Sequence, residues 1–114
     1  MKDFMLMFIG VNYAETDLSP EDIQERAQSW MGWQAKMEQQ GILRGGNALQ
    51  AGLTRITGPD RTVSDRASTE SKEIIGGYYL IQVDSLETAQ TACQDYPDYD
   101  LGGTVEIREL LVYS

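Results

Sequence analysis

Residues 65–83 read DRASTESKEIIGGYYLIQV, a polar segment followed by a densely apolar one. The apolar half, residues 77–83, has the aromatic and β-branched residues that favour a strand, and both of its alternating faces are apolar except at Gln82. Residues 4–10, FMLMFIG, repeat this pattern. A strand with one face in water would alternate apolar and polar residues, so we predict that both faces of these two strands are covered.

Two helices are predicted from their terminal signals. Ser19 followed by Pro20 is typical of a helix start, and Gly41 is expected to stop that helix. Asp84-Ser85 is expected to cap a second helix, with Glu87 placed to close a capping box on Asp84. The predicted inner faces consist of apolar residues at helical spacing, Ile23, Ala27, Trp30 and Met37 in the first helix and Leu86, Ala89, Cys93 and Tyr96 in the second.

The other segments complete a strand–helix–strands–helix–strand order. Residues 42–49 form a predicted strand, residues 53–57 and 61–64 a hairpin, residues 65–73 an exposed loop, and residues 104–112 the last strand. This order predicts an α+β fold of the ferredoxin-like type, a split βαβ arrangement with two helices on one face of an antiparallel sheet.

The covering of the second sheet face points to a partner. Two helices cover only one face of the predicted sheet, and a monomer would expose a contiguous apolar patch on the other face. We therefore predict a homodimer that packs sheet against sheet. The length of 114 residues fits one domain, residues 1–114.

Composition excludes several classes of partner. The net charge of −9 opposes binding to nucleic acid and to anionic membranes. The apolar run near the N-terminus is shorter than the roughly 20 residues of a membrane-spanning helix. The single cysteine, Cys93, has no internal disulfide partner and is expected to be a buried structural thiol. We predict a cytoplasmic protein.

The order of motifs resembles the YCII-related superfamily, specifically its DGPF branch, whose members read D-G-P-F-x-E-x-K-E followed by G-G-Y-Y. The matching residues are Asp65, Glu70, Lys72, Glu73, Gly76, Gly77, Tyr78 and Tyr79, together with GILRGG at residues 41–46 and VEIR at residues 105–108. Arg66, Ala67 and Ser68 replace G-P-F. The resemblance implies a ferredoxin-like fold and a dimer of the α/β-barrel type.

Catalysis is restricted by the lack of histidine. Some relatives carry a histidine on the first helix that is proposed to form a dyad with an aspartate. This chain has no histidine and carries Trp30 and Trp33 in the comparable stretch, so such a dyad is excluded. Asp65 remains as the candidate catalytic residue, acting as a general base if burial raises its pKa.

A small-molecule pocket is predicted where the first helix, the second strand and the polar loop converge. Aromatic walls with a few polar groups are typical of such pockets. The candidate lining residues are Trp33, Gln34, Arg44, Asp65, Lys72 and Tyr78.

Two other motifs have structural interpretations. The acidic segment at residues 94–100, QDYPDYD, lacks the glycine and glutamate of an EF-hand, so a solvated turn without metal is expected. The glycine pairs at residues 45–46 and 76–77 do not open helices, so they are interpreted as strand bulges rather than phosphate-binding loops.

Three hypotheses about function remain. The first is a homodimeric domain that binds a small molecule or acts as an accessory protein, with no cofactor. The second is a YCII-like enzyme that uses Asp65, with Arg44 or Lys72, without the histidine. The third is a regulatory partner of an extracytoplasmic-function sigma factor, which the resemblance implies.

Overall fold

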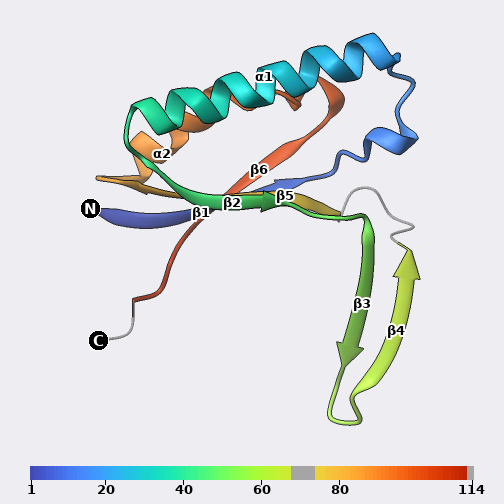
Figure 1. Cartoon of the computed structure of the whole chain (residues 1–114). Coiled ribbons are helices and arrows are strands. Elements are labelled where there is room, and N and C mark those ends of the chain that lie inside the picture. Colours follow the sequence, from blue (N-terminus) through green and yellow to red (C-terminus); the bar gives the residue numbers. More distant parts are fainter. Residues whose placement is uncertain (68–73, 113–114) are drawn as a thin grey trace.

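The computed structural model describes residues 1–67 and 74–112. In this part of the chain, four strands form an antiparallel sheet in the order β2 (Leu43–Ala48), β5 (Ile75–Val83), β1 (Lys2–Ile9), β6 (Thr104–Glu109). Helices α1 (Pro20–Gln39) and α2 (Leu86–Ala92) lie on the same face of the sheet (Figure 1). Because β5 lies between β2 and β1, which α1 connects, the ferredoxin-like split βαβ prediction is confirmed.

The core forms between this sheet face and the helices. In β1 every second side chain is buried, and these side chains meet buried residues of β5, α1 and α2. The buried cluster contains Phe4, Leu6, Phe8, Trp33, Met37, Ile81, Val83, Ala89, Cys93 and Tyr96. Leu6 and Ala89 have no exposed surface.

The helix starts match their predictions unequally. Ser19 caps α1 by accepting a hydrogen bond from the backbone N–H of Asp22 at 3.1 Å, and the Asp22 carboxylate accepts from the Ser19 N–H at 3.4 Å. In the predicted Asp84-Ser85 cap of α2, Ser85 is the capping residue and accepts from the Thr88 N–H at 3.2 Å, because its extended backbone places the hydroxyl over the first turn. The capping box on Asp84 is wrong, since Asp84 accepts from the Thr88 hydroxyl instead.

The buried stripe of α1 differs from the predicted one. Ile23 is 37% exposed, whereas Trp33 is 3% exposed and Met37 is 1% exposed. The inward-facing stripe consists of the half-buried Arg26 and Trp30 and the buried Trp33 and Met37, which also follow a helical repeat. In α2, Leu86 is likewise exposed instead of buried, and Cys93 is buried at the start of the 3₁₀ turn η3 (Cys93–Asp95) rather than inside the helix.

The hairpin of β3 (Gly52–Thr57) and β4 (Thr62–Ala67) projects away from the sheet on the side opposite the helices (Figure 1). Residues 65–67 were predicted to be part of a loop, but they belong to β4, which extends to the end of this described segment. Ile56 and Val63 on the hairpin are 65% and 63% exposed. An isolated two-stranded hairpin is marginally stable in water, so these side chains lack the support that a second surface would give.

The sheet face opposite the helices carries an apolar stripe. Met5, Met7 and Ile9 of β1 alternate with the buried set and are half-buried, and Met5 and Met7 pair with Leu80 and Tyr78 of β5. In the described part of the chain no element covers this face. The last strand ends at Glu109, before the predicted residue 112, and the chain beyond it leads away on the same side as the hairpin (Figure 1).

Candidate functional site

A groove of about 720 Å³ opens between α1 and the sheet, near the ends of β2 and β5. This volume lies in the range of small-molecule sites. Its apolar walls include the side chains of Phe8, Val11, Ala27, Trp30, Met31, Leu49, Ile74, Tyr79 and Tyr96. The polar side chains in the lining include Asn12, Tyr13, Gln34, Asn47, Gln50 and Asp98.

Phe8 is the centre of the aromatic wall. Its ring centroid lies 5.0 Å from that of Trp30 and 5.1 Å from that of Tyr79, both edge to face, and 5.5 Å from that of Tyr96, stacked. Such ring pairs add about 0.5–1.5 kcal/mol each to the burial of their area. Trp33 contacts the same cluster from the core side. The groove is therefore bordered by rings that are fixed by one another.

A buried carboxylate forms the inner polar end of the groove, which we call the Asp98 end: Tyr13, Trp30 and Asp98. Asp98 is 2% exposed. Its Oδ2 accepts from the Tyr13 hydroxyl at 2.6 Å and from Trp30 Nε1 at 3.2 Å, and Trp30 Nε1 also lies 3.0 Å from Tyr13 Oη. Arg26 donates to Asp98 Oδ1 at 3.0 Å from the other side. Such a buried charge is stable only because it is paired and hydrogen-bonded.

Local turns bring these residues together. Tyr13 begins the 3₁₀ turn η1 (Tyr13–Glu15), whose N-cap Asn12 accepts from the Ala14 N–H at 3.0 Å. Asp98 precedes the turn η4 (Tyr99–Leu101), and its carbonyl accepts from the N–H groups of Leu101 and Gly103 at 3.1 and 3.0 Å. The backbone thus holds Asp98 in place independently of its side chain.

The tyrosines of this site remain protonated near neutral pH. Burial, followed by the hydrogen bond to Asp98, raises the pKa of Tyr13 to about 12. Burial, followed by the charge of Asp98, also raises the pKa of Tyr96. Both phenols are therefore neutral, and Tyr13 acts as a donor to the carboxylate.

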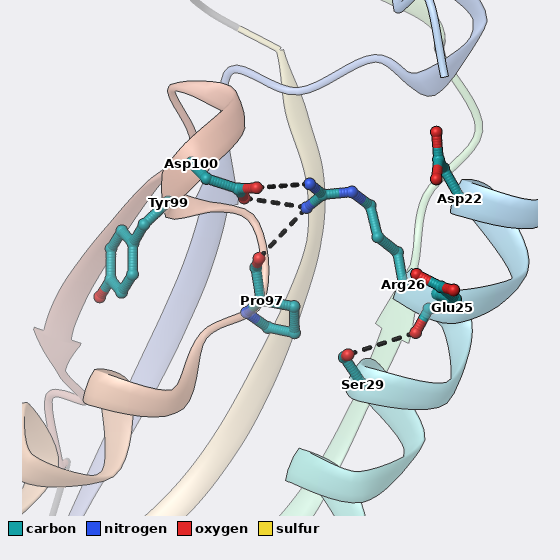
Figure 2. A pocket seen from close by; sticks show the side chains of 7 residues that line it. All are labelled: Asp22, Glu25, Arg26, Ser29, Pro97, Tyr99 and Asp100. Atoms are coloured by element: carbon teal, nitrogen blue, oxygen red, sulfur yellow. Dashed lines mark hydrogen bonds and ion pairs between the residues drawn. The ribbon is translucent and has the colours of Figure 1, made fainter. Parts of the chain in front are cut away.

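A second, shallower hollow of about 420 Å³ lies on the outer side of Arg26 (Figure 2). Figure 2 shows the Arg26 guanidinium bonded to Asp100 and to the Pro97 carbonyl, and its Nη1 also pairs with Asp98. Asp22 and Glu25 line the same hollow. The Arg26 guanidinium already binds these partners, and the other charged residues of the hollow are acidic, so the hollow is not suited to bind an anion. Arg26 instead connects α1 to the η4 turn.

The predicted pocket residues do not converge. Gln34 lines the groove, where its Oε1 accepts from the Tyr79 hydroxyl at 3.3 Å. Trp33 does not line it: its indole is buried and Nε1 donates to the Ala92 carbonyl at 2.9 Å. Arg44 is exposed and donates to the Gly41 carbonyl and to Gln82.

Three further predicted residues lie elsewhere. Tyr78 is on the sheet face opposite the helices, and its hydroxyl accepts from Asn47 at 3.3 Å. Asp65 is in β4 of the projecting hairpin, paired with Thr54. Lys72 lies outside the described residues. The groove residues at the Asp98 end were not among the predicted lining residues.

The acidic segment at residues 94–100 differs from the predicted solvated turn, because Asp98 is buried. Lys36 pairs with Asp95 at 2.6 Å, and Arg26 pairs with Asp98 and Asp100. Within residues 1–67 and 74–112, no group of three or more His, Cys, Asp or Glu side chains is arranged to hold a metal ion. The sequence feature that could have indicated the buried Asp98 is Arg26, one helical turn before Trp30, because an arginine on the inward-facing side of a helix requires an acidic partner.

Comparison with known proteins agrees with the architecture. A family model described as the YCII-related domain matches residues 5–114, and the chain belongs to this family. Among solved structures, the chain is similar to 5-chloro-2-hydroxyhydroquinone dehydrochlorinase from Burkholderia phenoliruptrix AC1100, in complex with 2,5-dihydroxybenzoquinone. The identity is 14%, the match covers 96% of this chain and 93% of the other, and the TM-score is 0.50, so this likeness concerns the fold. No curated protein matches.

Two predictions about class and location have partial outcomes. The YCII-related family is confirmed, whereas assignment to the DGPF branch stays a prediction. No helix in the described part of the chain is long and apolar enough to cross a membrane. Cys93 is buried as expected, and burial raises the pKa of its thiol to about 11.

Proposed function

We propose that this protein binds a small, planar, largely aromatic molecule in the groove between α1 and the sheet. The observation that carries the proposal is the groove itself, with the rings of Phe8, Trp30, Tyr79 and Tyr96 around it and the buried carboxylate of Asp98 at its inner end. Offset and edge-to-face contacts with such rings favour a flat guest. The quinone bound by the structurally similar dehydrochlorinase is a ligand of this shape.

The proposal includes a homodimer formed through the open sheet face. Met5, Met7 and Leu80 supply a half-buried apolar stripe there, and the hairpin that carries the exposed Ile56 and Val63 projects on the same side of the sheet (Figure 1). A second copy would cover both surfaces with one twofold contact and would support the hairpin, which has little packing of its own.

A groove-filling substitution tests ligand binding. Ala27 is an exposed helix position that lines the groove, next to Trp30 and Met31 on the helix surface, so Ala27→Trp would place an indole in the groove with little effect on the core. Ala35→Trp is the matched control, since Ala35 is exposed on α1 outside the groove lining. Binding of naphthalene-sized probes is measured by titration calorimetry.

The expected result is binding to the wild type and to Ala35→Trp, with a loss of about tenfold or more in affinity for Ala27→Trp, equivalent to about 1.4 kcal/mol. The proposal is wrong if the wild type binds none of the probes, or if Ala27→Trp binds them as the wild type does.

Two hypotheses from the sequence remain predictions. A catalytic role for Asp65 requires a partner for its carboxylate, and the backbone of Asp65 lies in the projecting hairpin rather than among the groove residues. A sigma-factor partner has no feature of the described residues that favours it over a second copy of this chain.

A further inference from the structure

The Tyr13 hydroxyl has a defined hydrogen-bonding direction. A tyrosine hydroxyl donates its single hydrogen and accepts hydrogen bonds at its oxygen. Its hydrogen is directed to Asp98 Oδ2 at 2.6 Å, and its oxygen receives the Trp30 Nε1–H at 3.0 Å, which is shared with Asp98 Oδ2 at 3.2 Å. In the described ranges, no other donor bonds to Tyr13 Oη. Because Tyr13 lines the groove and its oxygen receives an N–H that is shared with Asp98, this oxygen can accept a hydrogen bond from a ligand.

The donors around Asp98 are already used. Trp30 has a single N–H, which lies between Tyr13 Oη and Asp98 Oδ2. Arg26 approaches Asp98 from the outer hollow and is shared with Asp100 and the Pro97 carbonyl. Among the described residues, the Asp98 carboxylate accepts every hydrogen bond that it forms. The Asp98 end therefore offers a ligand acceptors, and Arg26, Asp98 and Asp100 together carry one net negative charge beside it.

We infer that the Asp98 end selects neutral aromatic ligands that carry an O–H or N–H donor, which bonds to Tyr13 Oη. The inference rests on the proposed function and specifies its ligand class. An aromatic ether fits the walls but has no hydrogen to donate to Tyr13 Oη, so it forms one hydrogen bond fewer and binds with lower affinity. An aromatic carboxylate brings a second negative charge beside Asp98, where the low local dielectric strengthens the repulsion.

Three probes with the same ring system test this selectivity in the wild type. They are 2-naphthol, 2-methoxynaphthalene and 2-naphthoate, compared by titration calorimetry near neutral pH. We expect 2-naphthol to bind about tenfold more tightly than the ether, as one net hydrogen bond allows, and the carboxylate to bind most weakly. This series requires no substitution, so it does not depend on the folding of a variant.

The Asp98→Asn variant should reverse the preference. Arg26 only donates hydrogen bonds, so it fixes the amide oxygen toward itself and turns the amide nitrogen toward Tyr13. Tyr13 then accepts from the amide and from Trp30, and its own hydrogen is free to point into the groove. The site becomes a donor without the negative charge, and 2-naphthoate should gain affinity over 2-naphthol. Asp100→Asn is the control, because Asp100 pairs with the same Arg26 outside the groove.

The outcomes separate this inference from the proposed function. If the probes bind and Ala27→Trp weakens them, but 2-naphthol has no advantage over the ether, the inference fails and the groove remains a binding site. An Asp98→Asn variant that folds and keeps the wild-type order of probes also overturns it. If no probe binds the wild type, the proposed function itself fails.

Discussion

Replacement of Asp98 by alanine tests whether the polar network joins the distant parts of the groove. The substitution removes the acceptor of three donors: the Tyr13 hydroxyl, Trp30 Nε1 and the Arg26 guanidinium. These donors come from the η1 turn and from α1, and Asp98 comes from the segment after α2. Loss of the carboxylate therefore leaves unpaired donors where these segments meet.

The expected cost follows from the bonds that are lost. Each of the three bonds goes to a charged carboxylate, and hydrogen bonds to charged groups contribute about 1.5–3 kcal/mol. The lower value applies, because Asp100 and the Pro97 carbonyl still bind Arg26, and Tyr13 Oη still accepts from Trp30 Nε1. We therefore expect Asp98→Ala to lower the free energy of unfolding by about 4.5 kcal/mol, and the Tm by about 15–20 °C.

Urea unfolding followed by circular dichroism measures this change, at one fixed protein concentration because association adds to stability. Asp95→Ala is the control: Asp95 forms an exposed ion pair with Lys36, so its removal should change the free energy of unfolding by no more than about 1 kcal/mol. A loss below about 1 kcal/mol for Asp98→Ala, with an unchanged m-value, would refute the view that this network holds the groove together.

Three further predictions concern pH, backbone and assembly. The raised pKa of Tyr13 means that the native state holds this proton more tightly than the unfolded chain does. The stability that it contributes should be retained below about pH 10 and decline as the pH approaches about 12, the pKa of Tyr13 in the folded protein. Tyr13→Phe should remove one late-titrating phenol from an ultraviolet titration. Gly46 has φ +149° and a Cβ there would overlap β5, so Gly46→Ala should cost about 2 kcal/mol or more in urea unfolding, whereas Gly32→Ala, in open space on α1, should be neutral or stabilising. Met7→Lys on the open sheet face should shift light scattering from dimer to monomer, with Met31→Lys on the exposed side of α1 as control; a wild-type monomer would contradict the dimer.

The sequence predicted the sheet better than the groove for a physical reason. The strands of residues 4–10 and 77–83 are apolar on both faces, a local pattern typical of central strands, and they correspond to the two central strands of the sheet. The start at Ser19 is equally local, because the cap bonds a residue three positions away. The projecting hairpin was predicted, but its direction depends on residues outside any local pattern.

The groove depends on contacts between distant residues. Tyr13 and Asp98 are 85 positions apart, and Trp30 and Asp98 are 68 apart. Trp33 was predicted to line the pocket and Trp30 to lie in the core, whereas Trp30 lines the groove and Trp33 is buried in the core, and this difference has a specific cause. Arg26 belongs to the inward-facing stripe of α1, but a charged residue is not expected there, so the predicted stripe runs through Ile23 and Ala27 instead. The predicted inner face is therefore rotated about the helix axis relative to the observed one, and it places Trp33 at its edge.

The aromatic cluster also gives this protein an internal optical reporter. The chain has two tryptophans, and both belong to the cluster around Phe8. Trp30 lines the groove and Trp33 is enclosed on its core side, with their ring centroids 5.6 Å apart. Emission from the unlabelled protein therefore originates beside the groove, so a guest that contacts Trp30 should change its intensity or wavelength without any attached dye.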